Sequence, residues 1–468
     1  MSLIAFLESL AIAAINRTGK LPRRGDSPDH SAVCIGTALD FDESPLSEGE
    51  LVFLKEEDRQ RHTYIIGATG SGKSSLLVQL IESDIKSGKS VVVLDMRGDL
   101  VGKLLARIAG MPNREIQPDR IELIDLRDDS FVPVFNPLAG STEPHSRAQA
   151  VLDVIRSQSP SWGVQLEETL RHALVSLAES GGALTDVERM LVNANFRERV
   201  LTIVTDQSAL DFFERYGELS PEKQMSWYLP VLNKLTPLFA LPVMRRLLGR
   251  GESIKISKLL DQPGKIVLIS LGYERLHSAA LLVGGLLVAA IQGGVFARTA
   301  IPEQGRNPVS MYVDEFENLA SSAFEQVIAE GRRFKLSLTL SHQNVAQLPT
   351  KLHQCIRNNV YTQIYFQTGA IDAAELSKEI VVSASKDDLR QMLIGQAVGE
   401  AFLLRRGQPP LRFRAKRLEK SAVTDEQLNT LMTCLRRQVS GTSKNSGTPM
   451  PTEPFKLEVR HDRLPRLR

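Results

Sequence analysis

Short apolar segments alternate with amphipathic ones over the first part of the chain. Strand patterns occur at His62–Ile66, Ser90–Leu94 and Ile121–Asp125, and the second of these is apolar almost throughout. Between them, Ser74–Ser87 and Leu100–Ile108 repeat apolar residues at helical spacing. Because strands of this apolar kind are typical of parallel sheets covered on both faces, the order predicts a parallel sheet with right-handed crossovers.

The pattern changes after Asn136-Pro137. From Arg147 to about Leu260 the periodicity is helical and strand signals are weak, which predicts an all-α insertion. We expect its helices at Ala148–Ser157, Gln165–Ser180, Leu184–Leu191, Phe196–Thr205 and Trp227–Phe239. Strand patterns then return at Lys265–Leu271, Pro308–Val313, Leu336–Ser341, Val360–Phe366 and Glu400–Leu404. The chain is therefore predicted to be an α/β protein whose mainly parallel sheet is split in sequence by an all-α domain.

These changes divide the chain into regions. We expect a lead-in with a short helix at 1–50, the first part of the α/β core at 51–140, the all-α insertion at 141–262, the second part of the core at 263–420, and a C-terminal helix with a disordered basic tail at 421–468. Gly19–Pro45 is rich in Pro, Gly, Asp and Ser and is expected to be mostly loop. Ser440–Pro454 is poor in apolar residues and is expected to be disordered.

Two apolar stretches raise the question of a membrane. Leu3–Ile15 carries Glu8 and is too short to span, so we expect an amphipathic docking helix. Ala279–Ile291 contains Gly284 and Gly285 and also falls short of the roughly 20 apolar residues that a span needs. Because it directly follows a predicted strand, we expect a buried helix packed on the sheet, and no transmembrane segment is predicted.

Composition gives no global sign of the partner. The chain has 468 residues, 42% apolar and 24% charged, as in globular proteins. Its formal net charge is +2, so a nucleic-acid-binding surface would have to be a local patch or a pore formed by assembly. The densest basic cluster is Arg405, Arg406, Arg412, Arg414, Lys416 and Arg417, which fits either a solvated β-hairpin or a phosphate-binding surface. Three distant cysteines without CxxC spacing argue against a disulfide framework or a zinc site.

A glycine-rich turn joins the first predicted strand to the helix that follows. It fits the pattern GxxxxGK[ST] with Gly67, Ala68, Thr69, Gly70, Ser71, Gly72, Lys73 and Ser74. Glycines let backbone N–H groups curl around an anion, and the helix N-terminus adds its positive dipole. In such a P-loop, Lys73 bridges the β- and γ-phosphates and Ser74 ligates Mg²⁺. The strand–turn–helix context therefore predicts ATP and Mg²⁺ as cofactors, against the alternative of a purely structural turn.

A second element is the strand that ends in Asp314-Glu315. We expect Asp314 to hold Mg²⁺ through water and Glu315 to polarise the attacking water. Ligands bind at the carboxyl ends of strands in open α/β sheets, and we expect this strand to lie beside the P-loop strand. A surface acidic pair is the alternative when the two residues are taken alone.

A third element is Gln343, which follows the strand pattern at Leu336–Ser341. Its amide both donates and accepts hydrogen bonds, so it suits a sensor that contacts the γ-phosphate and the attacking water. From spacing alone, a polar loop residue fits equally well.

Taken in order, these elements resemble the FtsK/HerA branch of P-loop ATPases and, within it, the TraG/TraD-type coupling proteins of conjugation and type IV secretion. The resemblance covers about Leu51–Leu418. The segments that carry it are Arg61–Thr63, Leu94–Leu100, Phe135–Leu138, Tyr312–Phe316, Ser341–Leu348 and Asn359–Phe366. It implies a RecA-like P-loop core and an all-α domain that meets substrate or relaxosome proteins.

The resemblance also implies a homo-oligomeric ring, expected to be a hexamer, that pumps single- or double-stranded DNA through a central channel. Active sites in that family lie between subunits, and a neighbour's arginine contacts the γ-phosphate. A Gly-Arg pair precedes the sensor strand in the family pattern, and here it is Gly331-Arg332. Arg332 is therefore the expected catalytic finger, with Arg333 in reserve and Arg357 as a weaker candidate. A solvated basic helix end is the alternative.

Membrane-bound coupling proteins usually begin with two transmembrane helices, and the sequence shows no adequate segment. We expect a cytoplasmic protein and leave open peripheral attachment at the inner membrane through Leu3–Ile15 or a partner, as well as docking on a secretion channel. The leading functional prediction is an ATP-driven DNA translocase that acts as a conjugative coupling protein. A type IV secretion ATPase with protein cargo and a nucleotide-gated adaptor without turnover are the alternatives.

Overall fold

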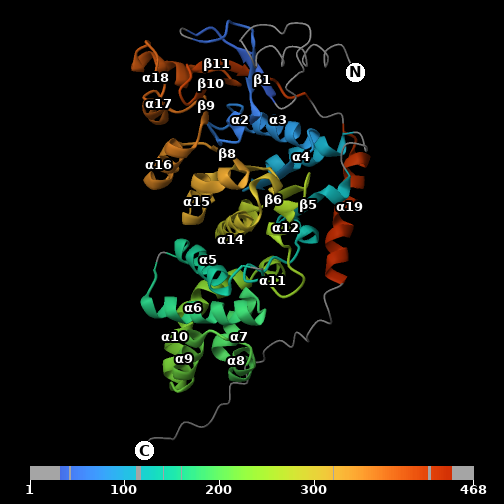
Figure 1. Cartoon of the computed structure of the whole chain (residues 1–468), viewed down its shortest axis with the longest axis vertical. Coiled ribbons are helices and arrows are strands. Elements are labelled where there is room, and N and C mark those ends of the chain that lie inside the picture. The colour runs from blue at the N-terminus through green and yellow to red at the C-terminus, as the bar shows by residue number, and fades with distance from the viewer. Residues whose placement is uncertain are drawn as a thin grey trace, which may run out of the picture.

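The computed structural model describes residues 32–41, 44–111, 117–140, 142–159, 161–319, 321–419 and 423–444. Within these residues eleven strands form one sheet in the order β2-β1-β11-β10-β9-β3-β8-β7-β4-β6-β5 (Figure 1). The strands are β1 (Val33–Ala38), β2 (Leu51–Leu54), β3 (Thr63–Ile66), β4 (Ser90–Asp95), β5 (Ile121–Asp125), β6 (Ile266–Ser270), β7 (Val309–Asp314), β8 (Leu336–His342), β9 (Thr362–Phe366), β10 (Glu400–Arg405) and β11 (Leu411–Ala415). Neighbours from β9 to β5 are parallel, and β10, β11, β1 and β2 extend the sheet antiparallel. The predicted α/β class with a mainly parallel sheet is confirmed.

Helices cover both faces of the sheet, so every residue of β4 and β6 is buried. One face carries α3 (Lys73–Lys86), α4 (Asp99–Ala109) and α19 (Asp425–Lys444) (Figure 1). The other carries α12 (Ile256–Asp261), α14 (Ser278–Ala297), α15 (Ser322–Glu330), α16 (Thr350–Asn359), α17 (Ala370–Leu376) and α18 (Lys386–Gly395). Two short helices, α2 (Glu56–Arg59) and α13 (Tyr273–Leu276), precede β3 and α14.

Helix α14 is apolar all round because it is covered on two sides. A Cβ atom at Gly284 would lie 2.3 Å from Cδ2 of Leu319, and one at Gly285 would lie 2.8 Å from Cγ1 of Val154 in α5. The glycines thus let the helix approach its neighbours closely on both sides. In the described residues, Ser278–Ala300 is the helical stretch long and apolar enough to cross a membrane, but 72% of its apolar window is buried inside the protein. The predicted buried helix is confirmed.

Between β5 and β6 the described chain forms helices and no strand. They are α5 (Pro144–Ser157), α6 (Val164–Ser180), α7 (Val187–Val192), α8 (Ala194–Leu201), α9 (Gln207–Gly217), α10 (Pro221–Phe239) and α11 (Pro242–Leu247), followed by α12. Helices α6 to α10 form a lobe beneath the sheet, which we call the helical lobe (Figure 1). A helix is present at each of the five predicted positions, but α8 ends at Leu201 rather than Thr205 and α10 begins at Pro221 rather than Trp227, with Ser220 as its N-cap. Helices α9, α11 and α12 were not expected. The predicted domain boundaries stay a prediction.

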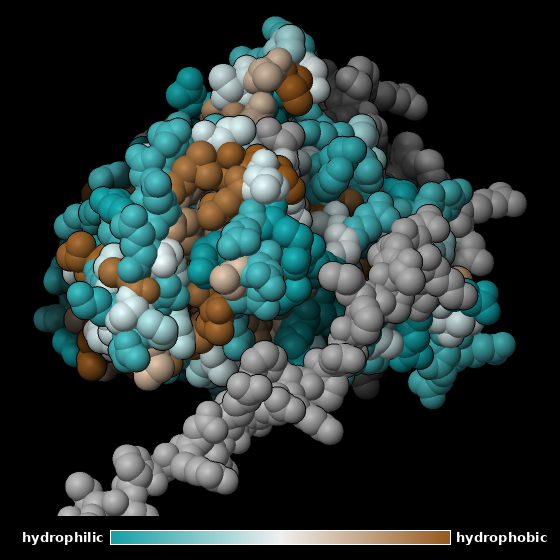
Figure 2. Space-filling view, turned by 90° about the horizontal axis from the view of Figure 1, so that it is seen from below, coloured by the Kyte–Doolittle hydropathy of each residue, from teal (hydrophilic) through white to brown (hydrophobic). Residues whose placement is uncertain are grey.

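The surface of the helical lobe carries scattered apolar side chains. Figure 2 looks at the molecule from the lobe end and shows apolar surface broken up by polar surface. Exposed apolar residues on the lobe include Val164 of α6, Val192 of α7, and Met225 and Leu229 of α10. They are available for contact with a partner.

Two local predictions are wrong in part, and two others lie outside the described residues. Val33–Ala38, inside the predicted loop Gly19–Pro45, is strand β1, because β2 and the distant β11 pair with it. Helix α19 runs to Lys444, so Ser440–Lys444 is helical rather than disordered. The predicted helix at Leu3–Ile15 and the basic tail lie outside the described residues.

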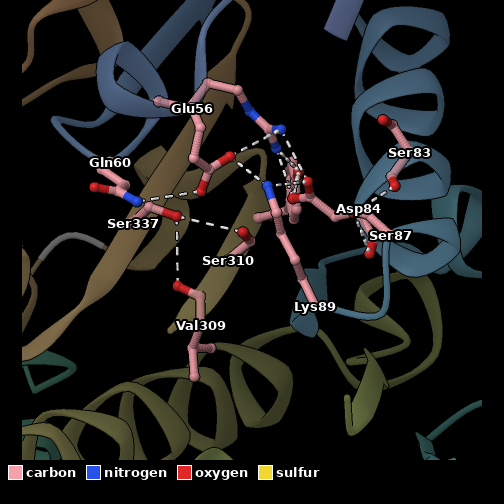
Figure 3. Close-up of polar contacts among 11 residues, drawn as sticks. Glu56, Gln60, Ser83, Asp84, Ser87, Lys89, Val309, Ser310 and Ser337 are labelled. Carbon is pink, nitrogen blue, oxygen red and sulfur yellow. Dashed lines mark hydrogen bonds and ion pairs between the residues drawn. The ribbon is translucent and has the colours of Figure 1, made fainter. Parts of the chain in front are cut away.

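A buried polar network ties helix α3 to the amino-terminal edge of the parallel strands (Figure 3). Arg59 donates to both carboxylate oxygens of Asp84, at 2.8 and 2.6 Å, and to the hydroxyl of Tyr312 in β7 at 2.6 Å. Tyr312 in turn donates to Asp84, and Lys89 forms ion pairs with Asp84 and Glu56. Burial opposes ionisation of Asp84, yet the Arg59 guanidinium keeps its pKa below the usual value. The network pairs the buried charges of Arg59 and Asp84 and anchors the far end of α3, at the edge opposite the carboxyl ends of the strands.

Candidate nucleotide site

The P-loop connects β3 to α3 at the carboxyl edge of the sheet. Gly70 and Gly72 have φ values of 78° and 120°, a region that favours glycine. A Cβ atom at Gly67 would lie 2.6 Å from Cβ of Phe366, so this position also requires glycine. Helix α3 then begins at Lys73, which places its N-terminus at the turn, where an anion is stabilised.

Lys73 lies inside the curl of the loop. Its ammonium group donates to the carbonyl oxygen of Gly67 and, at 3.0 Å, to that of Ala68, and the residue is 7% exposed. Burial lowers its pKa, although the nearby carboxylate of Asp314 acts in the opposite direction. The positive charge of Lys73 therefore lies inside the loop, close enough to interact with the carboxylate of Asp314.

The acidic pair lies at the carboxyl end of β7, where Asp314 is the last residue of the strand and Glu315 comes directly after it. Burial raises the pKa of Asp314 to about 6, and the charges of Asp95 and Glu315 add to the rise. Glu315 has a φ of 54°, so a side chain other than glycine is held in the left-handed region. Such strain, of the order of 1 to 3 kcal/mol, collects at functional sites.

The strand order corrects one expectation. The acidic strand β7 does not lie beside the P-loop strand β3, because β8 lies between them. Ile66 of β3 is level with His342 of β8, and Ser341 of β8 is level with Asp314 of β7. The strand that ends in Gln343 therefore separates the P-loop from the carboxylates.

This order produces a line of hydrogen bonds across the edge of the sheet. Thr69 Oγ1 donates to Gln343 Oε1 at 2.9 Å, and Gln343 Nε2 donates to Glu315 Oε1 at 3.0 Å. Arg97, in the loop after β4, donates from Nε to Glu315 Oε2 at 3.0 Å. The structure thus brings Gln343 to the place that a sensor needs, in contact with both the P-loop and the acidic pair.

Sequence reasoning missed two charged residues of this site. Arg97 belongs to a segment that carried the family resemblance, but no role was expected of it. Glu317 comes two residues after Glu315; burial raises its pKa to about 7, and its Oε2 atom is buried without a hydrogen-bond partner among the described residues. The only local signal for Glu317 was its closeness in sequence to the acidic pair.

His342 supports the site from within the sheet. It is fully buried, its Nε2 atom lies 2.5 Å from the hydroxyl of Tyr64 in β3, and burial lowers its pKa to about 3. The imidazole therefore stays neutral at physiological pH. We infer that the side chain of His342 links β8 to β3 through its hydrogen bond with Tyr64 and does not transfer a proton.

The candidate arginine finger lies at the other end of β8. Arg332 is exposed in the short turn Gly331–Phe334 that precedes the strand, whereas Gln343 follows the strand. At about 3.3 Å per residue, β8 separates the two by roughly 23 Å. Arg298 donates to the carbonyl oxygen of Phe334 at 2.9 Å and Arg306 to that of Arg333 at 2.6 Å, so the turn is held firmly. Arg332 therefore cannot serve the site of its own chain.

The reserve candidates differ in how they are engaged. Arg333 lies 3.9 Å from Glu330 and is largely exposed, whereas Arg357 forms an ion pair with Glu379 at 3.0 Å. In the basic cluster, which forms the hairpin β10–β11, Arg412 and Arg414 both pair with Glu400. Part of the charge of the cluster is therefore neutralised within the chain.

A P-loop, a carboxylate-ending strand and a sensor strand placed between them define a P-loop nucleotide triphosphatase with a RecA-like sheet. The chain belongs to the type IV coupling protein family: the model of the family described as "Type IV secretion-system coupling protein DNA-binding domain" matches residues 47–440.

Similar proteins agree with this assignment. The chain is 25% identical to the type 4 coupling protein DotL of Legionella pneumophila over 190 residues, which cover 37% of this chain and 24% of DotL. The match thus spans about a quarter of that relative.

The fold is shared with solved structures of low identity. The unbound bacterial conjugative coupling protein TrwB superposes with a TM-score of 0.58 at 15% identity, covering 83% of this chain and 95% of that one. VirB4 of Thermoanaerobacter pseudethanolicus superposes with a TM-score of 0.56 at 16% identity, covering 83% and 97%. TrwB has also been solved with ADP and Mg²⁺, and that structure superposes with a TM-score of 0.57 at 15% identity over 85% of this chain and 96% of TrwB.

Proposed function

We propose that this protein is an ATP-driven DNA translocase that acts as a conjugative coupling protein. The observation that carries the proposal is the line Thr69–Gln343–Glu315, which joins the P-loop to the acidic pair through the intervening strand. Through it, a change at the phosphate-binding loop reaches the carboxylate that activates water. That link is what a motor needs in order to couple nucleotide state to movement.

The residues present fit a magnesium nucleotide. Asp314 and Glu317 are half-buried close to Glu315, and burial together with repulsion between these carboxylates raises the pKa of both, so this edge favours an added cation. Ser74 and Asp314 would hold Mg²⁺, which when bound neutralises charge on the phosphate oxygens. Mg²⁺ is usually held in such sites by one or two carboxylates together with phosphates and water.

Each side chain then has a separate task. Lys73 leaves the carbonyl oxygens of its loop to bind the β- and γ-phosphates, and the N–H groups of the loop surround them. Glu315 accepts the proton of the attacking water, and Gln343 orients that water from its place beside Glu315. The neutral His342 holds the sensor strand in register.

The position of Arg332 supports a ring. Because it projects from the amino edge of the sheet while the nucleotide site lies at the carboxyl edge, Arg332 serves catalysis only when it reaches the site of a neighbouring subunit. We propose a homo-oligomeric ring, a hexamer, in which Arg332 stabilises the charge of the transferred phosphoryl group in trans.

Mixed rings test this assignment. Subunits with Arg332→Ala, mixed with subunits that carry Lys73→Ala, should regain ATP turnover, because each mutant supplies the part that the other lacks. Arg357→Ala is a matched control that should leave the in-trans effect in place. No regain of turnover at any mixing ratio would contradict the role of Arg332.

DNA as the cargo is tested by stimulation of ATP hydrolysis. Single- and double-stranded DNA should each be compared, and stimulation should fall steeply with salt because phosphate contacts release counterions. Turnover without any response to DNA would favour a protein cargo, and binding of ATP without turnover would favour a nucleotide-gated adaptor.

We also propose that the helical lobe docks relaxosome or secretion-channel proteins. Its exposed Met225 and Leu229 lie on one helix, α10, and support a partner surface. The double variant Met225→Glu/Leu229→Glu should keep DNA-stimulated ATPase activity and lower transfer of DNA between cells. Unchanged transfer would contradict the docking role.

We place the protein in the cytoplasm, attached peripherally at the inner membrane, and cell fractionation tests this placement.

A further inference from the structure

The loop after β4 is held rigidly at the edge of the nucleotide site. Asp95, the last residue of β4, accepts from the backbone N–H of Arg97 at 3.0 Å with one oxygen and from that of Val101 at 3.0 Å with the other. Gly98 has a φ of 101°, and a Cβ atom there would lie 2.4 Å from the guanidinium carbon of Arg127. Arg127 also donates to the carbonyl oxygen of Gly98 at 3.0 Å. These contacts therefore fix the backbone conformation at Arg97.

From this fixed backbone, the side chain of Arg97 reaches the carboxylate of Glu315. Strands β8, β7 and β4 are neighbours, and their carboxyl ends carry Gln343, Glu315 and Arg97 in that order. Gln343 holds Oε1 of Glu315 from the P-loop side, and Arg97 holds Oε2 from the other side, each at 3.0 Å. The two donors together fix the direction of the carboxylate.

The contact contributes little to stability. The side chain of Arg97 is 49% exposed and that of Glu315 is 17% exposed, and exposed ion pairs usually contribute less than about 1 kcal/mol. Without Arg97, Glu315 would lose its charged hydrogen-bond donor: Lys73 acts on it only at a distance, Asp314 and Glu317 are acidic, and the amide of Gln343 carries no charge. Orientation of the carboxylate is therefore the property that depends on Arg97.

We propose that Arg97 is a positioning residue for the general base, whose guanidinium holds the Glu315 carboxylate in the direction from which it takes the proton of water. The inference rests on the hydrolytic function proposed above. It assigns to the loop after β4 a part in the chemistry, although two strands, β8 and β7, lie between β4 and the P-loop strand β3.

The test is Arg97→Ala in the full chain, with kcat and KM for ATP measured separately. A misdirected base should lower kcat by about tenfold to a hundredfold while KM and the affinity for a fluorescent ADP analogue change by less than about twofold. Added guanidinium ions should restore part of kcat, and Arg97→Lys should keep more of it than Arg97→Ala. An unchanged kcat, or a loss that appears mainly in KM with a lowered Tm, would overturn the proposal.

Two further variants separate positioning from a general weakening of the fold. Glu274→Gln removes the other carboxylate near Arg97, at 3.9 Å and 78% exposed, and should leave kcat unchanged. In a Glu315→Gln background, Arg97→Ala should bring no additional loss of kcat, because the two residues act as one unit. Additive losses would show that Arg97 acts elsewhere. Absence of turnover in the wild-type protein would instead contradict the proposed function and leave this comparison without a baseline.

Discussion

The two edges of the sheet are built in opposite ways. At the amino edge, Arg59, Asp84 and Tyr312 are fully buried or nearly so, and the opposite charges of Arg59 and Asp84 are paired. At the carboxyl edge, Glu315 has strained backbone, and Glu317 has a buried carboxylate oxygen without a partner among the described residues. Opposite charges are thus paired within the chain at one edge, whereas carboxylates gather at the other.

The difference shows how one fold combines rigidity with readiness for chemistry. Helix α3 spans both edges: it begins at Lys73 in the P-loop and carries Asp84 near its other end. Anchoring the far end of α3 fixes its N-terminus and therefore the phosphate-binding loop. At the carboxyl edge, a magnesium nucleotide would supply partners for the clustered carboxylates.

The largest expected effect lies at the carboxyl edge. Glu315→Gln should lower ATP turnover by about a hundredfold or more, because the amide cannot take the proton of water, while nucleotide binding persists and the ATP-bound state accumulates. Turnover and retained nucleotide are measured on the same preparation. Lys73→Ala, which should lose nucleotide binding itself, is the control, and turnover at the wild-type rate in Glu315→Gln would show that the base has been misassigned.

The second largest effect is expected at the amino edge, on the stability of the fold. Asp84→Ala leaves the buried guanidinium of Arg59 without its partner and should lower the free energy of unfolding by about 3 to 5 kcal/mol. Denaturant unfolding measures it. Glu56 lies on the more exposed side of the same network, so Glu56→Gln should lower the free energy of unfolding by much less. Equal losses in the two variants would mean that burial of the pair does not matter.

A pH effect should distinguish the edges further. The pKa of Glu317, about 7, lies above its unfolded value near 4, so between these values the folded protein binds more protons than the unfolded chain. The contribution of Glu317 to stability therefore falls as pH rises through this window. Without Mg²⁺ and nucleotide, Glu317→Gln should gain about 1 kcal/mol relative to the wild type between pH 5 and pH 8. Parallel pH profiles of the two proteins in urea unfolding would count against a buried, unpaired carboxylate.

The smallest effect is expected at the rim of the amino edge. The hydroxyl of Ser337 donates long hydrogen bonds, at 3.4 Å, to the carbonyl oxygen of Val309 and the hydroxyl of Ser310 (Figure 3). Ser337→Ala should change the free energy of unfolding by less than about 0.5 kcal/mol in thermal or urea unfolding. A loss of more than about 1 kcal/mol in the free energy of unfolding would show that Ser337 also belongs to the stabilising network.

Much of this site was visible in the sequence. The P-loop, the strand that ends in Asp314-Glu315, the sensor Gln343 and the buried helix at Ala279–Ile291 all lie where local patterns predicted structure of that kind. Strand β1 was missed in a segment rich in Pro, Gly, Asp and Ser, and one of its two partners, β11, lies far away in the chain. The catalytic roles themselves stay predictions until the variants are measured.

The sequence by itself determined which residues can bind phosphate and activate water, and the alternation of strands and helices that carries them, because motifs and periodicity are local. Only the tertiary structure decided that β8 separates the P-loop from the acidic strand, that Arg97 reaches Glu315, and that Arg332 lies at the opposite edge. The physical reason is that strand order results from pairing between segments hundreds of residues apart. Such pairing leaves no trace in the spacing of neighbouring residues.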